Sequence, residues 1–135
     1  MDEHTSTYGF PAVDGDAGGV KVSFHDRPKT EICTAETIDR EIRESDEQDL
    51  RAALRDFLPW LDGPLVQAKT CLYTMTPDAH FVISAHPHHA QVHVACGFSG
   101  HGFKFCSVVG EVLADLATAG VTRHDLSLFT PSRFV

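Results

Sequence analysis

The chain of 135 residues has no long apolar run. Its longest apolar stretches are a few residues, as in Phe81-Val82-Ile83, whereas a helix that crosses a membrane needs roughly 20. Residues 1–4 are acidic, and no apolar segment of the kind found in secretory signals follows them. We therefore predict neither a membrane-spanning helix nor a secretory signal.

Lysine and arginine are scarce and scattered: 11 of them stand against 19 aspartates and glutamates, for a formal net charge of −8. A protein that binds the phosphate backbone of a nucleic acid presents a basic face to it. The acidic balance of this chain therefore predicts no nucleic-acid partner.

The four cysteines, at positions 33, 71, 96 and 106, include no C-x-x-C pair. This spacing excludes a zinc ribbon and a thioredoxin-type motif. Without a signal peptide, such cysteines are typical of free thiols in the cytoplasm rather than of a disulfide framework, so we expect a cytoplasmic protein.

The chain does contain enough apolar residues, 42%, for the core of one domain of ordinary size. Residues 20–25 alternate strictly, which predicts a half-buried strand with Lys21 and His25 on its polar face. The polar residues 26–44 predict a long connection. A capping-box spacing at Ser45 and Gln48, followed by apolar residues at helical spacing, predicts a helix over about 46–58 that ends before a proline.

The second half of the chain predicts strands over 65–75, 80–84 and 91–96, with turns at 76–78 and 86–89. A glycine-rich loop at 97–102 then precedes a strongly apolar helix over 103–119, which Gly120 ends. Glycines before a helix N-terminus suit an anion or a cofactor, but this loop lacks the last small residue of a dinucleotide fingerprint. A structural turn and a ligand-binding loop both remain compatible with the pattern.

Several individual side chains are also candidates for a functional role. Lys104 falls in the first turn of the last helix, where its charge opposes the helix dipole, so it indicates either a bound carboxylate or phosphate or a solvated lysine. We favour the anion, because His101 shares the loop. Lys21 and His25, taken by themselves, are most consistent with a solvent-facing strand surface. Cys71, central in a predicted strand, is expected to be a buried thiol.

Four histidines, His86, His88, His89 and His93, are candidates for binding zinc or copper. The segment contains a proline and straddles a turn, and His89 and His93 would converge only on a helix. We therefore favour a solvated turn and assign no metal-binding residue.

Five sequence blocks occur in order along the chain. They are Y-G-F-P at 8–11, V-K-V-x-x-H at 20–25, C-L-Y-T-x-T-P-D at 71–78, G-F-S-G-H-G-F-K-F at 97–105 and R-F at 133–134. Together these blocks resemble the C-terminal part of the monomeric sarcosine oxidase and N-methyltryptophan oxidase family, which are FAD-dependent amine oxidases. The resemblance covers about residues 8–134.

The resemblance implies which residues meet the cofactor. Cys71 would carry FAD through a thioether to the 8α-methyl group of the flavin. The further cofactor-binding residues would be Tyr73, Thr74, Gly100, His101 and Gly102.

The resemblance also implies catalytic roles for Lys21, beside the flavin ring where it activates O₂, and for His25 in the substrate pocket. A fixed cation suits negative charge that develops on oxygen. Tyr8 and Lys104 would bind the substrate, Lys104 through the substrate carboxylate. The implied reaction converts an N-methyl amino acid and O₂ into the demethylated amino acid, formaldehyde and hydrogen peroxide.

The implied fold is α+β: a mixed β-sheet of the substrate domain, mainly residues 1–90, and a terminal strand, glycine loop and helix of the FAD-binding domain, mainly residues 91–135. The N-terminal dinucleotide-binding part has no counterpart here, so we expect a truncated product, a split subunit or a fragment. The apolar helix would then lack partners, which predicts exposed apolar surface and either self-association or a companion chain. The alternatives are a catalytically inactive remnant without flavin and a metal-binding module built on the four histidines.

Overall fold

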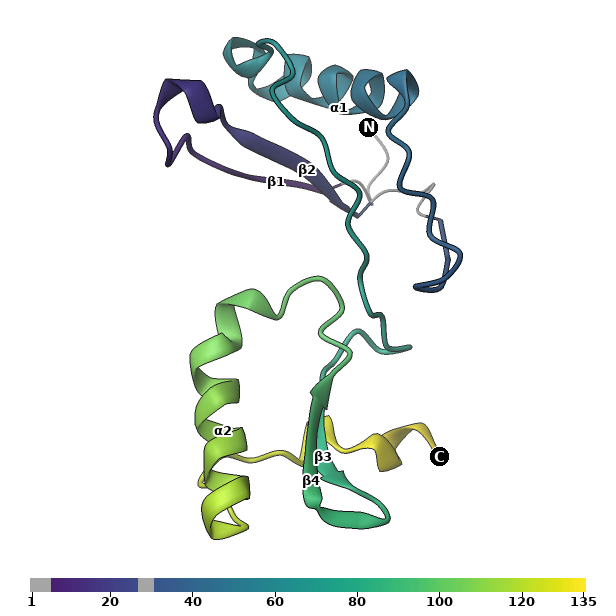
Figure 1. Ribbon diagram of the computed structural model, residues 1–135, viewed down its shortest axis with the longest axis vertical. Helices are drawn as coiled ribbons and strands as arrows, with labels where there is room; N and C mark the ends of the chain where they lie inside the picture. The colour runs from purple at the N-terminus through teal and green to yellow at the C-terminus, as the bar shows by residue number, and fades with distance from the viewer. Residues whose placement is uncertain (1–5, 27–30) are drawn as a thin grey trace. The chain divides into compact units, whose positions relative to one another are not determined.

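The structure is a computed structural model that describes residues 6–26 and 31–135. The chain divides into two compact units, residues 1–72 and 73–135. Figure 1 shows one strand pair and one long helix in each unit. The described part therefore mixes helix and strand, in agreement with the predicted α+β class. None of its helices combines the length and the apolar character needed to cross a membrane.

The first unit is built on an antiparallel hairpin. Its strands are β1 (Ser6–Phe10) and β2 (Lys21–Asp26), and a 3₁₀ turn (Asp16–Gly18) lies between them. β2 confirms the predicted strand, whereas the sequence pattern did not indicate β1. Gly9 is opposite Val22, and a Cβ on Gly9 would lie 2.5 Å from the Lys21 carbonyl oxygen, so a larger residue would push the strands apart.

Helix α1 (Glu44–Phe57) confirms the helix predicted near 46–58, but the predicted cap at Ser45 is wrong. The helix begins earlier because Arg43 and Asp46 bond reciprocally at its start. The Arg43 N–H donates to the Asp46 carboxylate at 3.0 Å, and the Asp46 N–H donates to the Arg43 carbonyl at 3.1 Å. An acidic residue at this position also suits the positive end of the helix dipole.

Two other segments of the first unit connect these elements. The connection predicted over 26–44 has no helix or strand in residues 31–43; residues 27–30 lie outside the described part, as do residues 1–5. The strand predicted over 65–75 is wrong, because these residues form neither helix nor strand. No described strand pairs with this segment, so its backbone has no ladder to join.

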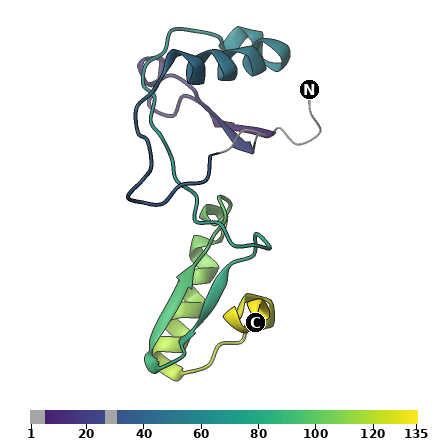
Figure 2. The same ribbon diagram turned by 90° about the vertical axis from the view of Figure 1, so that its right-hand side faces the viewer.

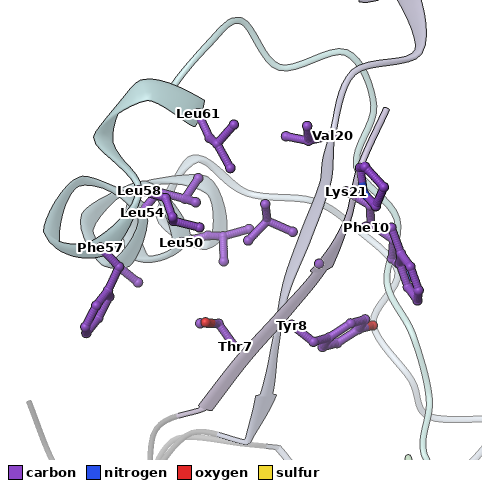
Figure 3. A pocket seen from close by; sticks show the side chains of 14 residues that line it. Thr7, Tyr8, Phe10, Val20, Lys21, Leu50, Leu54, Phe57, Leu58 and Leu61 are labelled. Atoms are coloured by element: carbon purple, nitrogen blue, oxygen red, sulfur yellow. The ribbon is translucent and has the colours of Figure 1, made fainter. Parts of the chain in front are cut away.

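The apolar side of α1 faces the β1–β2 hairpin, and Figure 3 shows the side chains that converge there. Between helix and hairpin lies an open apolar hollow of about 470 Å³, to which Val20, Leu50 and Leu54 contribute. The hydrophobic side chains that are buried all belong to the second unit, so the described part of the first unit has no closed core. This hollow is a different surface from the one predicted on the helix over 103–119, which stays a prediction.

The second unit packs a hairpin against a helix. β3 (Val82–His86) and β4 (His89–Cys96) are antiparallel, and α2 (Cys106–Ala119) follows a 3₁₀ turn at Phe103–Phe105. These elements confirm the strands predicted near 80–84 and 91–96 and the helix predicted over 103–119. Gly120 ends α2 with a φ of 73°, as expected of a glycine that caps a helix.

The core of the second unit lies between β3 and α2. Phe81, Ile83 and Val112 are buried there. After α2 the chain returns to β3 through 3₁₀ turns at Ser127–Phe129 and Pro131–Phe134 (Figure 2). The C-terminal residues therefore lie beside the strand that carries the core.

The two hairpins are separate two-stranded antiparallel sheets, so the described residues do not form the mixed sheet predicted from the sequence. A mixed sheet needs strands that run parallel to one another, and each described strand pairs only with its hairpin partner. β4 crosses residue 90, where the substrate-domain and flavin-domain parts were predicted to meet. That assignment of the two parts stays a prediction.

Two glycines of the second unit should respond oppositely to alanine. Gly100 has a φ of 78°, and a Cβ on it would lie 2.5 Å from the Tyr73 ring, so Gly100→Ala should destabilise the unit by about 2 kcal/mol or more. Gly110 lies inside α2 with open space around it, so Gly110→Ala should stabilise by about 0.5–1 kcal/mol. Urea unfolding followed by circular dichroism measures both; equal effects of the two variants would contradict the structure.

Candidate functional site

One face of the first hairpin gathers an amino group and three rings. Tyr8 and Phe10 lie two residues apart on β1, Phe10 is opposite Lys21 on β2, and the side chains of these three residues share the face that points away from α1 (Figure 3). The Lys21 Nζ lies 5.1 Å from the centroid of the Tyr8 ring and 5.5 Å from that of the Phe10 ring. The Tyr8 and His25 rings meet edge to face at 6.3 Å. We call these four residues the cation–aromatic face.

The cation–aromatic face brings together three residues that the resemblance assigned to catalysis and substrate binding, namely Tyr8, Lys21 and His25. Alternation predicted Lys21 and His25 on one face of the strand, and the ring of Tyr8, from the other strand, contacts both. An exposed cation over aromatic rings gains about 0.5–1 kcal/mol, which favours one position of the Lys21 amino group. Phe10 was missed, although its alternation with Tyr8 was a signal that could have found it.

In the second unit, residues 73–80, which we call the docking segment, lie against the glycine loop at 97–102. The Ser99 N–H donates to the Thr74 carbonyl at 3.0 Å, and the Thr76 N–H donates to the Ser99 hydroxyl oxygen at 3.2 Å. Ser99 is only 4% exposed, so these polar groups satisfy one another away from water. The Tyr73 ring covers Gly100.

The rest of the glycine loop is fixed in the same way. His101 Nε2 lies 2.9 Å from the Ala79 carbonyl oxygen of the docking segment. A Cβ on Gly102 would lie 2.6 Å from Phe98, and one on Gly100 would meet Tyr73. Close contacts within the protein therefore explain why both positions are glycine. The structure brings Tyr73, Thr74, Gly100, His101 and Gly102 close together, and their contact with a cofactor stays a prediction.

Lys104 stands in the 3₁₀ turn that immediately precedes α2. Its side chain is exposed, its Nζ lies 5.6 Å from the centroid of the Phe105 ring, and it forms no ion pair within the part of the chain that the structure describes. An anion from outside the chain would balance this charge at the positive end of the helix.

Cys71 is an exposed free thiol in a segment without regular structure. The expectation that it is buried was wrong, because no sheet forms around residues 65–75 to cover it. Cys71 belongs to the first unit, whereas Tyr73 and Thr74 begin the second. An exposed thiol is accessible to covalent attachment of a cofactor.

The histidines at the β3–β4 turn contact one another. The rings of His86 and His89 lie 5.0 Å apart, and the His88 N–H donates to His86 Nδ1 at 3.2 Å. Within residues 6–26 and 31–135, no three or more His, Cys, Asp or Glu side chains are placed to hold a metal ion. The alternative of a metal-binding module therefore receives no support.

A polar contact that the sequence did not indicate joins the docking segment to the last residues of the chain. Arg133 Nε donates to Asp78 Oδ2 at 2.7 Å, and Arg133 Nη2 donates to Asp78 Oδ1 at 3.2 Å. The guanidinium holds the pKa of the Asp78 carboxyl well below its ordinary value, with further help from the His80 N–H. The two residues are 55 positions apart, so no local pattern could pair them.

Known proteins resemble the chain over nearly its whole length. Residues 2–116 match the family described as DAO, FAD dependent oxidoreductase. The chain is 49% identical to the monomeric sarcosine oxidase of Streptomyces avermitilis, over 97% of the chain and 34% of that protein. It is 36% identical to the peroxisomal sarcosine oxidase of Homo sapiens, over 94% of the chain and 32% of the relative. It is also 36% identical to the N-methyl-L-tryptophan oxidase of Salmonella dublin, over 94% of the chain and 33% of that protein.

The chain therefore belongs to the family of FAD-dependent oxidoreductases. This result confirms the family resemblance and the FAD-dependent class of protein that it implied. The chain spans about one third of the length of the sarcosine and N-methyltryptophan oxidases that it matches.

The residues present fit a flavin cofactor. Cys71 offers an exposed thiol, and Lys21 offers an ammonium group on an exposed aromatic face. A thiolate can form a covalent bond to carbon, and a fixed cation can stabilise negative charge on a reduced oxygen species. Both groups are therefore compatible with the FAD cofactor of this family, and their roles toward it stay predictions.

Asp78→Asn should make thermal stability less sensitive to acid. A carboxylate whose pKa falls on folding stabilises the folded state above its ordinary pKa near 4, and that contribution is lost as the pH falls below this value. Between about pH 5 and pH 2 the Tm of the wild type should fall more steeply than that of Asp78→Asn. Asp56→Asn, which alters an exposed aspartate of α1, should keep the wild-type slope. Equal slopes for the wild type and Asp78→Asn would refute the ion pair.

Proposed function

We propose that the chain is the substrate-side and flavin-attaching part of an FAD-dependent oxidase that demethylates N-methyl amino acids. The products are the demethylated amino acid, formaldehyde and hydrogen peroxide. The observation that carries this proposal is the cation–aromatic face, which gathers Lys21, Tyr8 and His25 in a chain 49% identical to a monomeric sarcosine oxidase. When bound, FAD supplies the chemistry of accepting a hydride equivalent and reducing O₂.

Lys21 stabilises the negative charge that develops as O₂ is reduced. Its ammonium group already lies over the rings of Tyr8 and Phe10, so little reorganisation is needed when the charge appears. Tyr8 and His25 line the substrate pocket beside it. An imidazole there can donate or accept a hydrogen bond, so His25 is suited to orient the substrate amine.

The other proposed site residues bind rather than react. Lys104 binds the substrate carboxylate, because its exposed cation has no ion-pair partner in the described residues. Cys71 attaches FAD through its thiol. The cofactor is contacted by Tyr73, Thr74, Gly100, His101 and Gly102. Attachment at a single sulfur would keep the cofactor in place through repeated turnovers.

A second candidate function is an inactive remnant of an oxidase without flavin. It is favoured by the glycine loop, because contacts with Tyr73 and Phe98 within the protein already explain Gly100 and Gly102 without a cofactor. The open apolar hollow of the first unit offers a surface for a companion chain or a second copy. The four free cysteines support a reducing, cytoplasmic location in either case.

Covalent flavin distinguishes the two candidates. Protein purified from its native cells and precipitated with acid should retain a fluorescent flavin, because a thioether survives denaturation. Cys71→Ser should lose this fluorescence, whereas Cys106→Ser, which alters another exposed thiol, should keep it. A colourless wild-type precipitate would overturn the flavin proposal and favour the inactive remnant.

Lys21→Met should separate the two halves of the reaction in flavin-loaded protein. The rate constant for O₂ reduction should fall by about 100-fold or more, because a preorganised charge is lost, while anaerobic oxidation of sarcosine changes much less. Stopped-flow absorbance measures both rates. Lys69→Met, which removes an exposed lysine elsewhere in the first unit, is the control and should leave both rates unchanged. Equal losses in both rates would exclude the proposed role of Lys21.

A further inference from the structure

Two motifs singled out in the sequence have no part in the proposed function: T-P-D at 76–78 and R-F at 133–134. They meet in the structure. The guanidinium of Arg133 binds both carboxylate oxygens of Asp78, and its side chain is only 14% exposed. A bidentate pair whose guanidinium is largely covered is more directional than an ordinary surface ion pair, although the Asp78 side chain is 35% exposed.

The same guanidinium also binds two backbone carbonyls. Arg133 Nη2 donates to the His80 carbonyl at 2.9 Å, and Nη1 donates to the Thr130 carbonyl at 2.9 Å. The Phe134 ring lies 4.1 Å from the guanidinium carbon. Arg133 therefore ties the C-terminal turn to the turn that ends the docking segment.

The hydrogen bonds continue from this turn to the glycine loop. The Thr76 hydroxyl donates to the same His80 carbonyl at 2.8 Å, and the Thr76 N–H donates to the Ser99 hydroxyl oxygen at 3.2 Å. The Ser99 N–H then reaches the Thr74 carbonyl at 3.0 Å. An unbroken path thus links Arg133 to the backbone of Thr74.

We propose that Arg133 is a positioning residue that fixes Tyr73 and Thr74 on the glycine loop, acting through the His80 carbonyl, Thr76 and Ser99. Its consequence for catalysis rests on the proposed function, in which these residues contact the flavin and follow Cys71 in the sequence. Lysine cannot replace arginine here, because one ammonium group cannot bind a carboxylate in two places and two carbonyls at once.

Amide hydrogen exchange of the flavin-free 135-residue chain tests the path directly. In Arg133→Lys and Arg133→Gln, exchange at the Thr76 and Ser99 amides should accelerate by about 10-fold or more, while the Val112 and Leu116 amides of α2 change by less than about 2-fold. Arg123→Lys alters an exposed arginine that pairs with Glu111 in the same unit, and it should leave all four amides unchanged.

A uniform acceleration across residues 73–135 would show a general loss of stability and would overturn the positioning role, as would unchanged exchange at Thr76 and Ser99. If Arg133→Gln does not fold, Arg133→Lys still decides, since it keeps the charge. Acid-stable flavin is the second readout: Arg133→Lys should retain at least 5-fold less than the wild type. A wild type without flavin refutes the proposed function, whereas the exchange result still decides the role of Arg133.

Discussion

The hydrogen bonds of one buried residue, Ser99, hold the docking segment against the glycine loop. Its N–H and its hydroxyl are both engaged by that segment, at Thr74 and Thr76. A buried polar group left without a partner costs about 1–3 kcal/mol, so separating the two segments is penalised at both atoms. Ser99 itself has a φ of 50°, and its neighbours Gly97 and Gly100 also have positive φ values, which gives the loop the sharp course that these contacts need.

The two units hold their site residues by different means. In the second unit a small core and a path of hydrogen bonds position Tyr73, Thr74 and His101. In the first unit no described hydrophobic side chain is buried, and the cation–aromatic face depends on cross-strand pairing of β1 with β2. Pairing across a hairpin fixes which side chains are neighbours even where the core is open, because side chains alternate strictly along each strand. The open apolar hollow behind this face offers a surface that a companion chain or a second copy would cover.

Local sequence patterns predicted the elements whose signals lie within a few residues. Alternation at 20–25, helical spacing near 46–58 and the apolar run closed by Gly120 all correspond to observed elements. The strand predicted over 65–75 failed because a strand requires a partner, and local sequence does not show whether one exists. β1 was missed because five residues interrupted by a glycine give little periodic signal.

The candidate site was predictable only where residues could be matched to a family. Composition and periodicity gave Lys21 and His25 no role beyond a strand surface, and they gave no reason to connect Tyr8 with either residue. The contacts of Ser99 and the pairing of Asp78 with Arg133 join residues 23 and 55 positions apart. Such contacts depend on which distant segments meet in the folded chain, and local sequence patterns do not predict this.

We infer that the docking segment and the glycine loop form one fixed body before any cofactor binds. The proton NMR spectrum of the flavin-free chain tests this at Tyr73 and Gly100. We expect nuclear Overhauser contacts between the Tyr73 ring and the Gly100 α-protons, which should be shifted upfield by the ring that covers them. Gly100 α-protons at random-coil positions, without contacts to the ring, would contradict it.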